Sequence, residues 1–332
     1  MRPKLSDVAK KAGVSVTTVS RVINNYGYLS KETKAKVKLA MQELNYQPNS
    51  VARSLQGKQT YLIGIIFPNI SNPFFGELVE RLECLLFAKG YKTILCNSAN
   101  DPQKEHTYLQ MLMANQVDGI ISGAHNLGIK EYQQTNLPMV SFDRNLSADI
   151  PIVSADNYRG AQMATAELYR CGCRQIYYLG NANIEGNPTD QRLRGYRDYM
   201  KAKDLKAKVC SLNYGDTKLI KMMLIKKLLE QDKVDGIVCS DDLTAILVCL
   251  VAEELKIKVP QDLMVIGFDG TQLIRDYFPQ LTTIKQPLND IASLLIKLLL
   301  QRIKHPDQKF KNTIYTLPVE LCMGKTVNPN QA

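Results

Sequence analysis

The 332-residue chain contains no tryptophan, only three histidines and no long apolar run. Its longest apolar stretches, such as residues 245–252, are far shorter than the roughly 18 residues of a membrane-spanning helix. The histidines are scattered, and the eight cysteines include no C-x-x-C pair, so we predict no metal site and reduced thiols in the core. Because no apolar segment follows the first residues, we expect no signal peptide and a cytoplasmic protein without membrane contact.

Motifs of catalysis are also missing. The chain has no G-x-S-x-G elbow, no Walker loop, no H-E-x-x-H and no G-x-G-x-x-G. Pairs of aspartates could serve glycoside hydrolysis in principle, but nothing in the sequence singles out an acid and a base. We therefore expect neither an enzyme nor a bound cofactor.

Charge is present but unevenly distributed. Residues 1–60 carry a net charge of +8 out of +10 for the whole chain, so a basic head precedes a nearly neutral body. This asymmetry indicates contact with a polyanion, although a solvated basic face is the simpler alternative.

The basic head shows three short helical patterns. Ser6 is the expected N-cap of the first, which Gly13 ends, while Ser15 and Ser30 precede the second and third. Two short helices joined by a tight turn that contains glycine are typical of a helix-turn-helix DNA-binding domain, here predicted for residues 1–47.

The body contains an internal repeat. The segments VDGIIS (117–122) and VDGIVCS (234–240) stand 117 residues apart, and each follows the same strand, helix, strand, helix order. Continuous apolar strands that alternate with amphipathic helices predict an α/β fold of two doubly wound parallel-sheet subdomains facing each other across a cleft.

The segments that follow the predicted strands are rich in Asn, Asp and aromatic residues: 68–75, 97–101, 123–126, 141–144, 181–192, 213–216, 240–242 and 267–270. Ligands bind beyond the carboxyl ends of parallel strands, and amides, carboxylates and aromatic faces suit a polyhydroxylated ligand. Simpler alternatives exist for single residues. Asn97 and Asp242 fit Asx turns or N-caps, and Phe74 or Phe75 fits the core.

Residues 48–58, PNSVARSLQGK, resemble a linker but have helix signals. Pro48 and Asn49 start a helix, Gly57 ends it, and Val51 and Leu55 share one face. A helix of two turns is not stable alone in water, so we expect it to need a partner.

The segments LSDVAKKAGVSVTTVSRVINN and NYQPNSVARSLQGK, followed by the duplicated body that ends GFDGTQL…FPQLTTIKQP, resemble the LacI/GalR family of bacterial transcriptional repressors over essentially the whole chain. The resemblance implies a head (1–47), a hinge helix and linker (48–60) and an effector-binding and dimerisation core (61–332) like periplasmic sugar-binding proteins. It further implies an N-subdomain of about 61–159 plus 290–317 and a C-subdomain of about 160–287 plus 320–332. Three crossovers are expected near 159–161, 286–290 and 317–320.

The resemblance makes the second helix the recognition helix, on which Val16, Thr17 and Arg21 read bases in the major groove. Val16 fits the core as an alternative, and an arginine commonly contacts guanine. The expected phosphate contacts are Ser6, Thr18, Ser20 and Asn24. In the hinge, Leu55 is expected to wedge between base pairs in the minor groove, with Asn49 and Arg53 close to the DNA.

For the effector site, the resemblance and the loop positions select Phe74, Phe75, His125, Asp143, Arg192, Asp241, Asp269 and Gln286. The three aspartates would repel one another unless a cation such as Arg192 joined them. Asp241 stands where many sugar-responsive members have asparagine, and Thr217 stands where many have an aromatic residue. Several carboxylates with one clear arginine favour a neutral sugar over a sugar phosphate, unless Arg144 also points inward.

Within the family, the phrases KTILCNS, QVDGIISGAHNLGI and SDDLTAILV are most similar to sucrose-operon repressors of Gram-positive bacteria. The expected partners are pseudo-palindromic double-stranded operator DNA, a small sugar effector and a second copy of the chain. A tetramer is not expected, because the C-terminus has no leucine heptads. The alternatives are a sugar-binding protein of the transport class or a sugar-processing enzyme, and both induction and corepression remain open.

Overall fold

The computed structural model divides the chain into two compact units, residues 1–60 and 61–332, which are described separately. The structure describes residues 3–23, 26–47, 59–114, 116–126, 128–134, 137–182, 186–213, 215–306, 308, 310 and 313–328.

Within its described residues, the first unit contains helices α1 (Leu5–Ala12), α2 (Val16–Ile23) and α3 (Lys31–Glu43). They enclose a small core in which Val8, Val19 and Val37 have no exposed surface. Each helix thus contributes a fully buried valine, and Ala9, Ala40 and partly buried apolar side chains complete the core of a basic unit.

The helix ends of this unit follow local chemistry. The hydroxyl of Ser15 accepts from the Thr18 amide at 3.1 Å, and that of Ser30 accepts from the Thr33 amide at 3.1 Å, as expected of N-caps. Gly13, with φ of 65°, ends α1. The expectation for Ser6 is wrong, because α1 begins at Leu5, two residues earlier than an N-cap at Ser6 requires. The N-cap position belongs to Lys4, whose amide donates to the Asp7 carboxylate at 2.7 Å.

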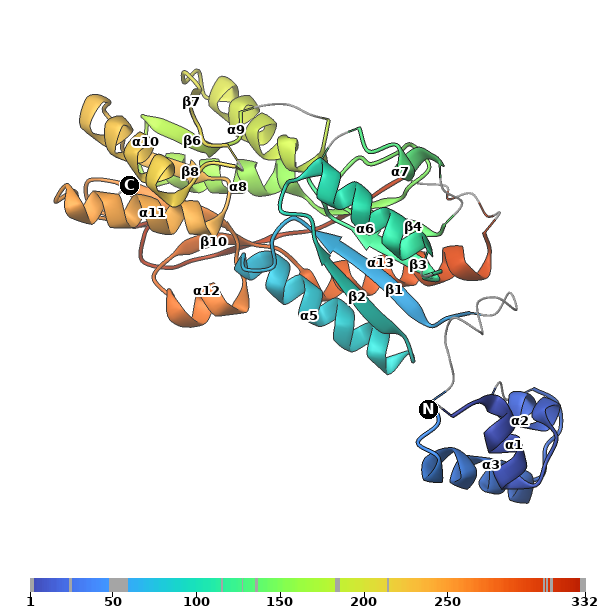
Figure 1. Ribbon diagram of the computed structural model, residues 1–332. Coiled ribbons are helices and arrows are strands. Elements are labelled where there is room, and N and C mark those ends of the chain that lie inside the picture. Colours follow the sequence, from blue (N-terminus) through green and yellow to red (C-terminus); the bar gives the residue numbers. More distant parts are fainter. Residues whose placement is uncertain are drawn as a thin grey trace. The chain divides into compact units, whose positions relative to one another are not determined.

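The second unit contains two six-stranded sheets (Figure 1). The first sheet is, in spatial order, β11 (Ile314–Leu317), β5 (Ile152–Ala155), β4 (Met139–Phe142), β3 (Gly119–Ser122), β1 (Leu62–Phe67) and β2 (Lys92–Asn97). The second is β12 (Glu320–Cys322), β10 (Thr282–Lys285), β9 (Met264–Asp269), β8 (Gly236–Cys239), β6 (Ile176–Gly180) and β7 (Lys208–Ser211). The two orders correspond strand by strand, as the internal repeat predicts. All strand pairs are parallel except β10 with β12, which is antiparallel.

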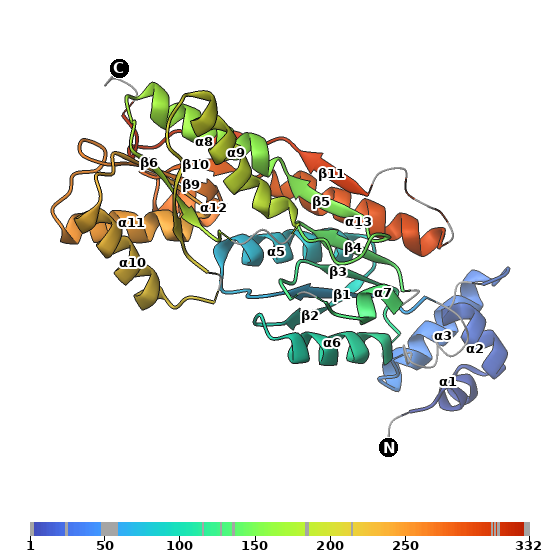
Figure 2. The ribbon, with the colours of Figure 1, turned by 90° about the horizontal axis from the view of Figure 1, so that it is seen from above.

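Helices cover both faces of each sheet (Figure 2). On the first sheet, α5 (Pro73–Ala88) and α13 (Leu288–Lys304) pack on one face, while α6 (Pro102–Ala114) and α7 (Glu131–Gln134) pack on the other. On the second sheet, α8 (Asn157–Arg170) and α9 (Gln191–Ala202) oppose α10 (Lys218–Gln231), α11 (Asp242–Glu254) and α12 (Gln272–Tyr277). A short 3-10 turn, η1 (Pro188–Asp190), precedes α9. No helix in the described part of the chain is long and apolar enough to cross a membrane.

We call each sheet with its helices the first and the second subdomain. The chain passes between them after β5, after β10 and after β11, because α8 packs on the second sheet, α13 on the first, and β12 joins the second. The first passage thus lies at Asp156, just before α8, rather than within residues 159–161. Three adjacent connections make a hinge, and they place the carboxyl ends of β1, β4, β8 and β9 opposite one another.

The eight cysteines are all free, and most are buried or half-buried. Cys84 on α5 is exposed, so the prediction that all of them lie in the core is wrong at this position.

Candidate functional site

Helix α2 presents a polar face. Val19 is buried, whereas Val16, Thr17 and Arg21 are exposed and Ser20 is half-buried. Positions 16, 17, 20 and 21 share one side of a helix, opposite the core contact. The side chain of Val16 is 45% exposed, which excludes the alternative that it belongs to the core.

The other predicted DNA contacts in the first unit lie in different surroundings. Ser6 is exposed near the start of α1. Thr18 is half-buried, and its hydroxyl lies 2.8 Å from that of Ser15, at the start of α2. The Nε of Arg21 donates to the carbonyl of Tyr26 at 3.4 Å, which folds the side chain over the following turn. Asn24, Asn49, Arg53 and Leu55 lie outside the described residues.

The second unit has a cavity between its subdomains, with about 1110 Å³ of space not filled by atoms, part of it open to solvent. All eight predicted effector residues line it: Phe74, Phe75, His125, Asp143, Arg192, Asp241, Asp269 and Gln286. They come from both subdomains, so a ligand bound here contacts both at once.

Aromatic rings form the wall on the first subdomain. Asn72 caps α5 by accepting from the Phe74 amide at 2.9 Å, which sets Phe74 and Phe75 at the cavity. Their ring centroids are 5.5 Å apart, and the Phe75 ring lies edge-on to His125 at 5.8 Å. Phe74 is also buried in the core of the subdomain, so it serves both roles that its position in the sequence allowed.

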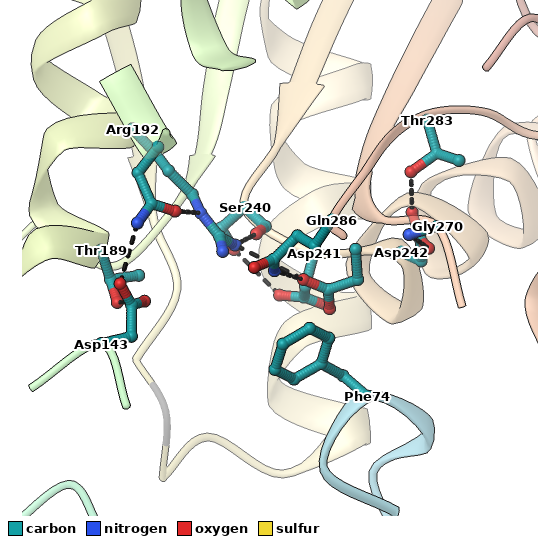
Figure 3. A network of polar contacts seen from close by, with 12 residues as sticks. Phe74, Asp143, Thr189, Arg192, Ser240, Asp241, Asp242, Gly270, Thr283 and Gln286 are labelled. Carbon is teal, nitrogen blue, oxygen red and sulfur yellow. Dashed lines mark hydrogen bonds and ion pairs between the residues drawn. The ribbon is translucent and has the colours of Figure 1, made fainter. Parts of the chain in front are cut away.

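Arg192 is the central cation of the opposite wall (Figure 3). Its Nη1 donates to the carbonyl of Ser240 and lies 3.7 Å from a carboxylate oxygen of Asp269. Its Nε donates to the side-chain carbonyl of Asn157 at 2.7 Å, and its guanidinium stacks on Phe268 at 3.7 Å. These contacts fix the position of the guanidinium. Its positive charge lies close to Asp269, as we expected for a cavity in which several carboxyl groups meet.

Asp241 and Asp242 have separate roles. Asp241 is the N-cap of α11, accepting from the Thr244 amide at 2.8 Å and from the hydroxyls of Ser240 and Thr244, each at 2.9 Å. Asp242, expected in an Asx turn or as an N-cap, is instead the first residue of the helix and is not among the residues that line the cavity. It accepts from the Gly270 amide at 2.7 Å, after β9, and from the Thr283 hydroxyl at 2.5 Å, in β10.

His125 and Arg144 form a second polar group at the cavity. Nη2 of Arg144 donates to Nε2 of His125 at 2.6 Å, and because a guanidinium only donates, the imidazole proton lies on Nδ1. Burial and the nearby Arg144 charge hold the pKa of His125 well below its ordinary value, so the ring is neutral. Arg144 lines the cavity, so two buried arginines rather than one face the carboxylates.

Burial raises the pKa of Asp143, against the opposing influence of Arg144 and Arg192. Burial raises the pKa of Asp269 well above its ordinary value, although Arg192 opposes this. Both carboxyl groups have lost water, so a hydroxyl that donates to them would compensate for part of that loss. The site therefore suits a ligand with several hydroxyl groups.

Sequence reasoning left the direction of Arg144 open and did not single out Thr189 or Asn157. Arg144 lines the cavity and donates to the Thr189 hydroxyl, which in turn donates to Asp143. Asn157 lies behind the lining and bonds to both Asp143 and Arg192. Thr189 stands in the polar segment before Arg192, which was the one available signal. Thr217, which stands where many family members have an aromatic residue, caps α10 and is not among the residues that line the cavity. In the described part of the chain, no group of three His, Cys, Asp or Glu residues is arranged to hold a metal ion.

Two family models match this chain. The model described as bacterial regulatory proteins, lacI family, matches residues 4–49, the three-helix unit. The model described as a periplasmic binding protein-like domain matches residues 165–327, most of it in the second subdomain.

Whole-chain relatives and solved structures agree with these matches. The sucrose operon repressor of Pediococcus pentosaceus is 60% identical over 326 residues, covering 98% of this chain and all of that protein. The lac repressor dimer bound to operator and the anti-inducer ONPF has a TM-score of 0.83 at 27% identity, over 98% of this chain and 99% of that one. A LacI-type regulator from Alkaliphilus metalliredigens, complexed with D-xylulofuranose, has a TM-score of 0.72 at 32% identity, over 81% of this chain and 99% of that one. This chain belongs to the lacI family of bacterial regulatory proteins.

Proposed function

We propose that this regulator is the repressor of a sugar-utilisation operon, and that a small sugar in the cavity, sucrose or a related saccharide, controls its binding to operator DNA. The observation that carries the proposal is the gathering of eight side chains from both subdomains around one cavity, in a chain that also has a helix-turn-helix unit. The identity of 60% and 50% to sucrose operon repressors of Pediococcus pentosaceus and Streptococcus mutans supports sucrose as the first sugar to test.

The chemistry of the cavity supports a neutral sugar. Asp143, Asp241 and Asp269 accept hydrogen bonds from hydroxyl groups, and Phe75 offers a ring for the apolar side of a sugar. Arg144 weakens the argument against a sugar phosphate, because it adds a second buried guanidinium. Its hydrogen bonds to Thr189, His125 and the Asp143 carbonyl, however, already engage it with the protein.

The DNA partner is proposed from the first unit. The polar face of α2 would enter the major groove, with Val16, Thr17 and Arg21 toward the bases and Ser20 toward the backbone. Two heads of a homodimer would read a pseudo-palindromic operator, and the hinge segment 48–60 would pair with its copy on DNA. Such a protein acts on the chromosome, so we place it in the cytoplasm. The curated relatives are repressors, and we propose no catalytic step.

A gel-shift titration with the DNA upstream of the chain's own operon tests the proposal. Tight binding that falls steeply with salt is expected, since phosphate contacts release counterions. Sucrose, fructose and ribose, with the sugar phosphates as a second set, should be added to separate reactions. A change in operator affinity with one of them identifies the effector, and its sign distinguishes induction from corepression. Absent or salt-independent DNA binding would contradict the regulator, and sugar binding without an effect on DNA would leave a sugar-binding protein.

A further inference from the structure

Asn157 occupies the first passage between the subdomains. β5 ends at Ala155, Asp156 caps α8, and Asn157 is the first residue of that helix. Its side chain is buried, with 2% of the residue exposed, and it is not among the residues that line the cavity. A buried amide at a hinge needs partners for both its donor and its acceptor.

Both partners of this amide are cavity residues. Nδ2 of Asn157 donates to Oδ1 of Asp143 at 2.9 Å, in the first subdomain, and Oδ1 accepts from Nε of Arg192 at 2.7 Å, in the second. A guanidinium only donates and a carboxylate only accepts. An amide is therefore the side chain of this size that can join them.

The contacts continue from Arg192 to the second passage. Arg192 lies 3.7 Å from Asp269, and Asp269 accepts from the side-chain amide of Gln286 at 2.8 Å, immediately after β10. One series of buried contacts thus starts at the first passage, crosses the cavity wall and ends at the second. A change in the angle between the subdomains must change the distance from Asp143 to Arg192, which Asn157 spans.

We propose that Asn157 is a positioning residue, which holds Asp143 and Arg192 at the spacing that the ligand meets and keeps the two subdomains in the relative orientation seen in the structure. The role of this spacing in ligand binding rests on the proposed function, whereas the role of Asn157 in orienting the subdomains does not.

A reciprocal exchange of side chains tests the proposal. In Asn157→Asp, two carboxylates face each other. In Asp143→Asn, one carbonyl oxygen has to replace the two carboxylate oxygens that accept from Asn157 and from Thr189. In the double variant, the amide introduced at position 143 donates to the carboxylate introduced at position 157, and that carboxylate still accepts from Arg192. The carbonyl oxygen at position 143 still accepts from Thr189. The net charge of the double variant equals that of the original chain. We expect each single change to disrupt the contact and the double change to restore it.

Two backbone amides report the angle independently of any sugar. The Asn145 amide donates to the Asn187 side chain at 3.0 Å, and the Gln272 amide donates to the Glu77 carboxylate at 2.8 Å, each across the boundary between the subdomains. Hydrogen exchange of peptides that contain these amides should be about tenfold faster in each single variant of the full-length chain and return toward the original rate in the double variant. A peptide from strand β8 serves as the control and should not change. Equal exchange in the double and single variants would overturn the proposal.

Calorimetric titration with sucrose tests whether Asn157 also affects ligand binding. Asn157→Asp, which changes no lining residue, should bind about tenfold more weakly, whereas variants at Asp143 alter the lining itself and are compared only by hydrogen exchange. If Asn157→Asp does not fold, the exchange of Asp143→Asn compared with that of the double variant decides the question. If the original chain binds none of the sugars tested, the effector assignment fails, while the exchange experiment still decides the role of Asn157.

Discussion

Asp269 and Gln286 are joined twice. The Gln286 side-chain amide donates to the Asp269 carboxylate at 2.8 Å, and the Gln286 backbone amide donates to the Asp269 carbonyl at 3.0 Å. Asp269 lines the cavity at the end of β9, and Gln286 lies where the chain passes to the first subdomain. A ligand hydroxyl that bonds to Asp269 is thus connected through this one carboxyl group to Gln286 at the hinge.

Asp269→Asn should weaken sugar binding. The change replaces one of the two carboxyl oxygens beside Arg192 with an amide that only donates, and a buried group left without its partner costs about 1–3 kcal/mol. Calorimetry should show a loss of roughly tenfold to a hundredfold in affinity. Thr217→Ser, outside the cavity lining and still able to cap α10, is the matched control. Unchanged affinity in Asp269→Asn would contradict the assignment of Asp269 to the effector site.

Asp242→Asn should change how stability depends on pH. Burial raises the pKa of Asp242 from 3.8 to about 7, against hydrogen bonds from Thr283 and Gly270. Between about pH 4 and pH 7 the folded chain binds this proton more tightly than the unfolded chain, so the contribution present below pH 4 is lost as the pH rises to 7. Asparagine does not titrate. The variant should therefore gain stability relative to the original chain across this window, by up to about 4 kcal/mol. Urea unfolding at pH 4, 5.5 and 7 measures it, and parallel curves for the two chains would speak against the prediction.

Arg21→Lys should reduce operator affinity selectively. A bidentate contact to guanine contributes about 1–3 kcal/mol of discrimination, which lysine supplies poorly because it lacks the planar fork. Gel shifts with operator and with unrelated DNA of equal length should show a loss of roughly fivefold to a hundredfold on the operator and little change on the unrelated DNA. Equal losses on both would indicate that Arg21 contacts phosphate instead.

Leu55→Ala should separate DNA binding from sugar binding. The wedge role predicts operator affinity lower by roughly tenfold or more, because the kinked duplex loses its apolar support. Sugar affinity measured by calorimetry should remain within about twofold, since the cavity belongs to the second unit. Gln56→Ala, next to Leu55 in the sequence, is the control. Full operator affinity in Leu55→Ala would remove the wedge role.

Much of the architecture and of the candidate site was accessible from the sequence. The apolar period, Gly13, Ser15 and Ser30 predict the three helices of the head, because helix ends are decided by nearby residues. The repeated VDGI segments predict two parallel sheets, and the carboxyl ends of parallel strands share one edge. That rule, with the family resemblance, selected eight residues that all line one cavity.

The remaining features depend on side-chain directions between elements far apart in the sequence. Neighbouring residues alone do not reveal that Asp241 rather than Asp242 caps α11, or that Arg144 faces the cavity. Asn157 reads as an ordinary helix start until Asp143 and Arg192 are brought to either side of it. Local sequence determined the helices, strands and residue types at the strand ends, because caps and periodicity act over a few residues. Only the tertiary structure decided which buried groups satisfy one another, because a buried polar atom is paired by whatever the fold places within about 3 Å.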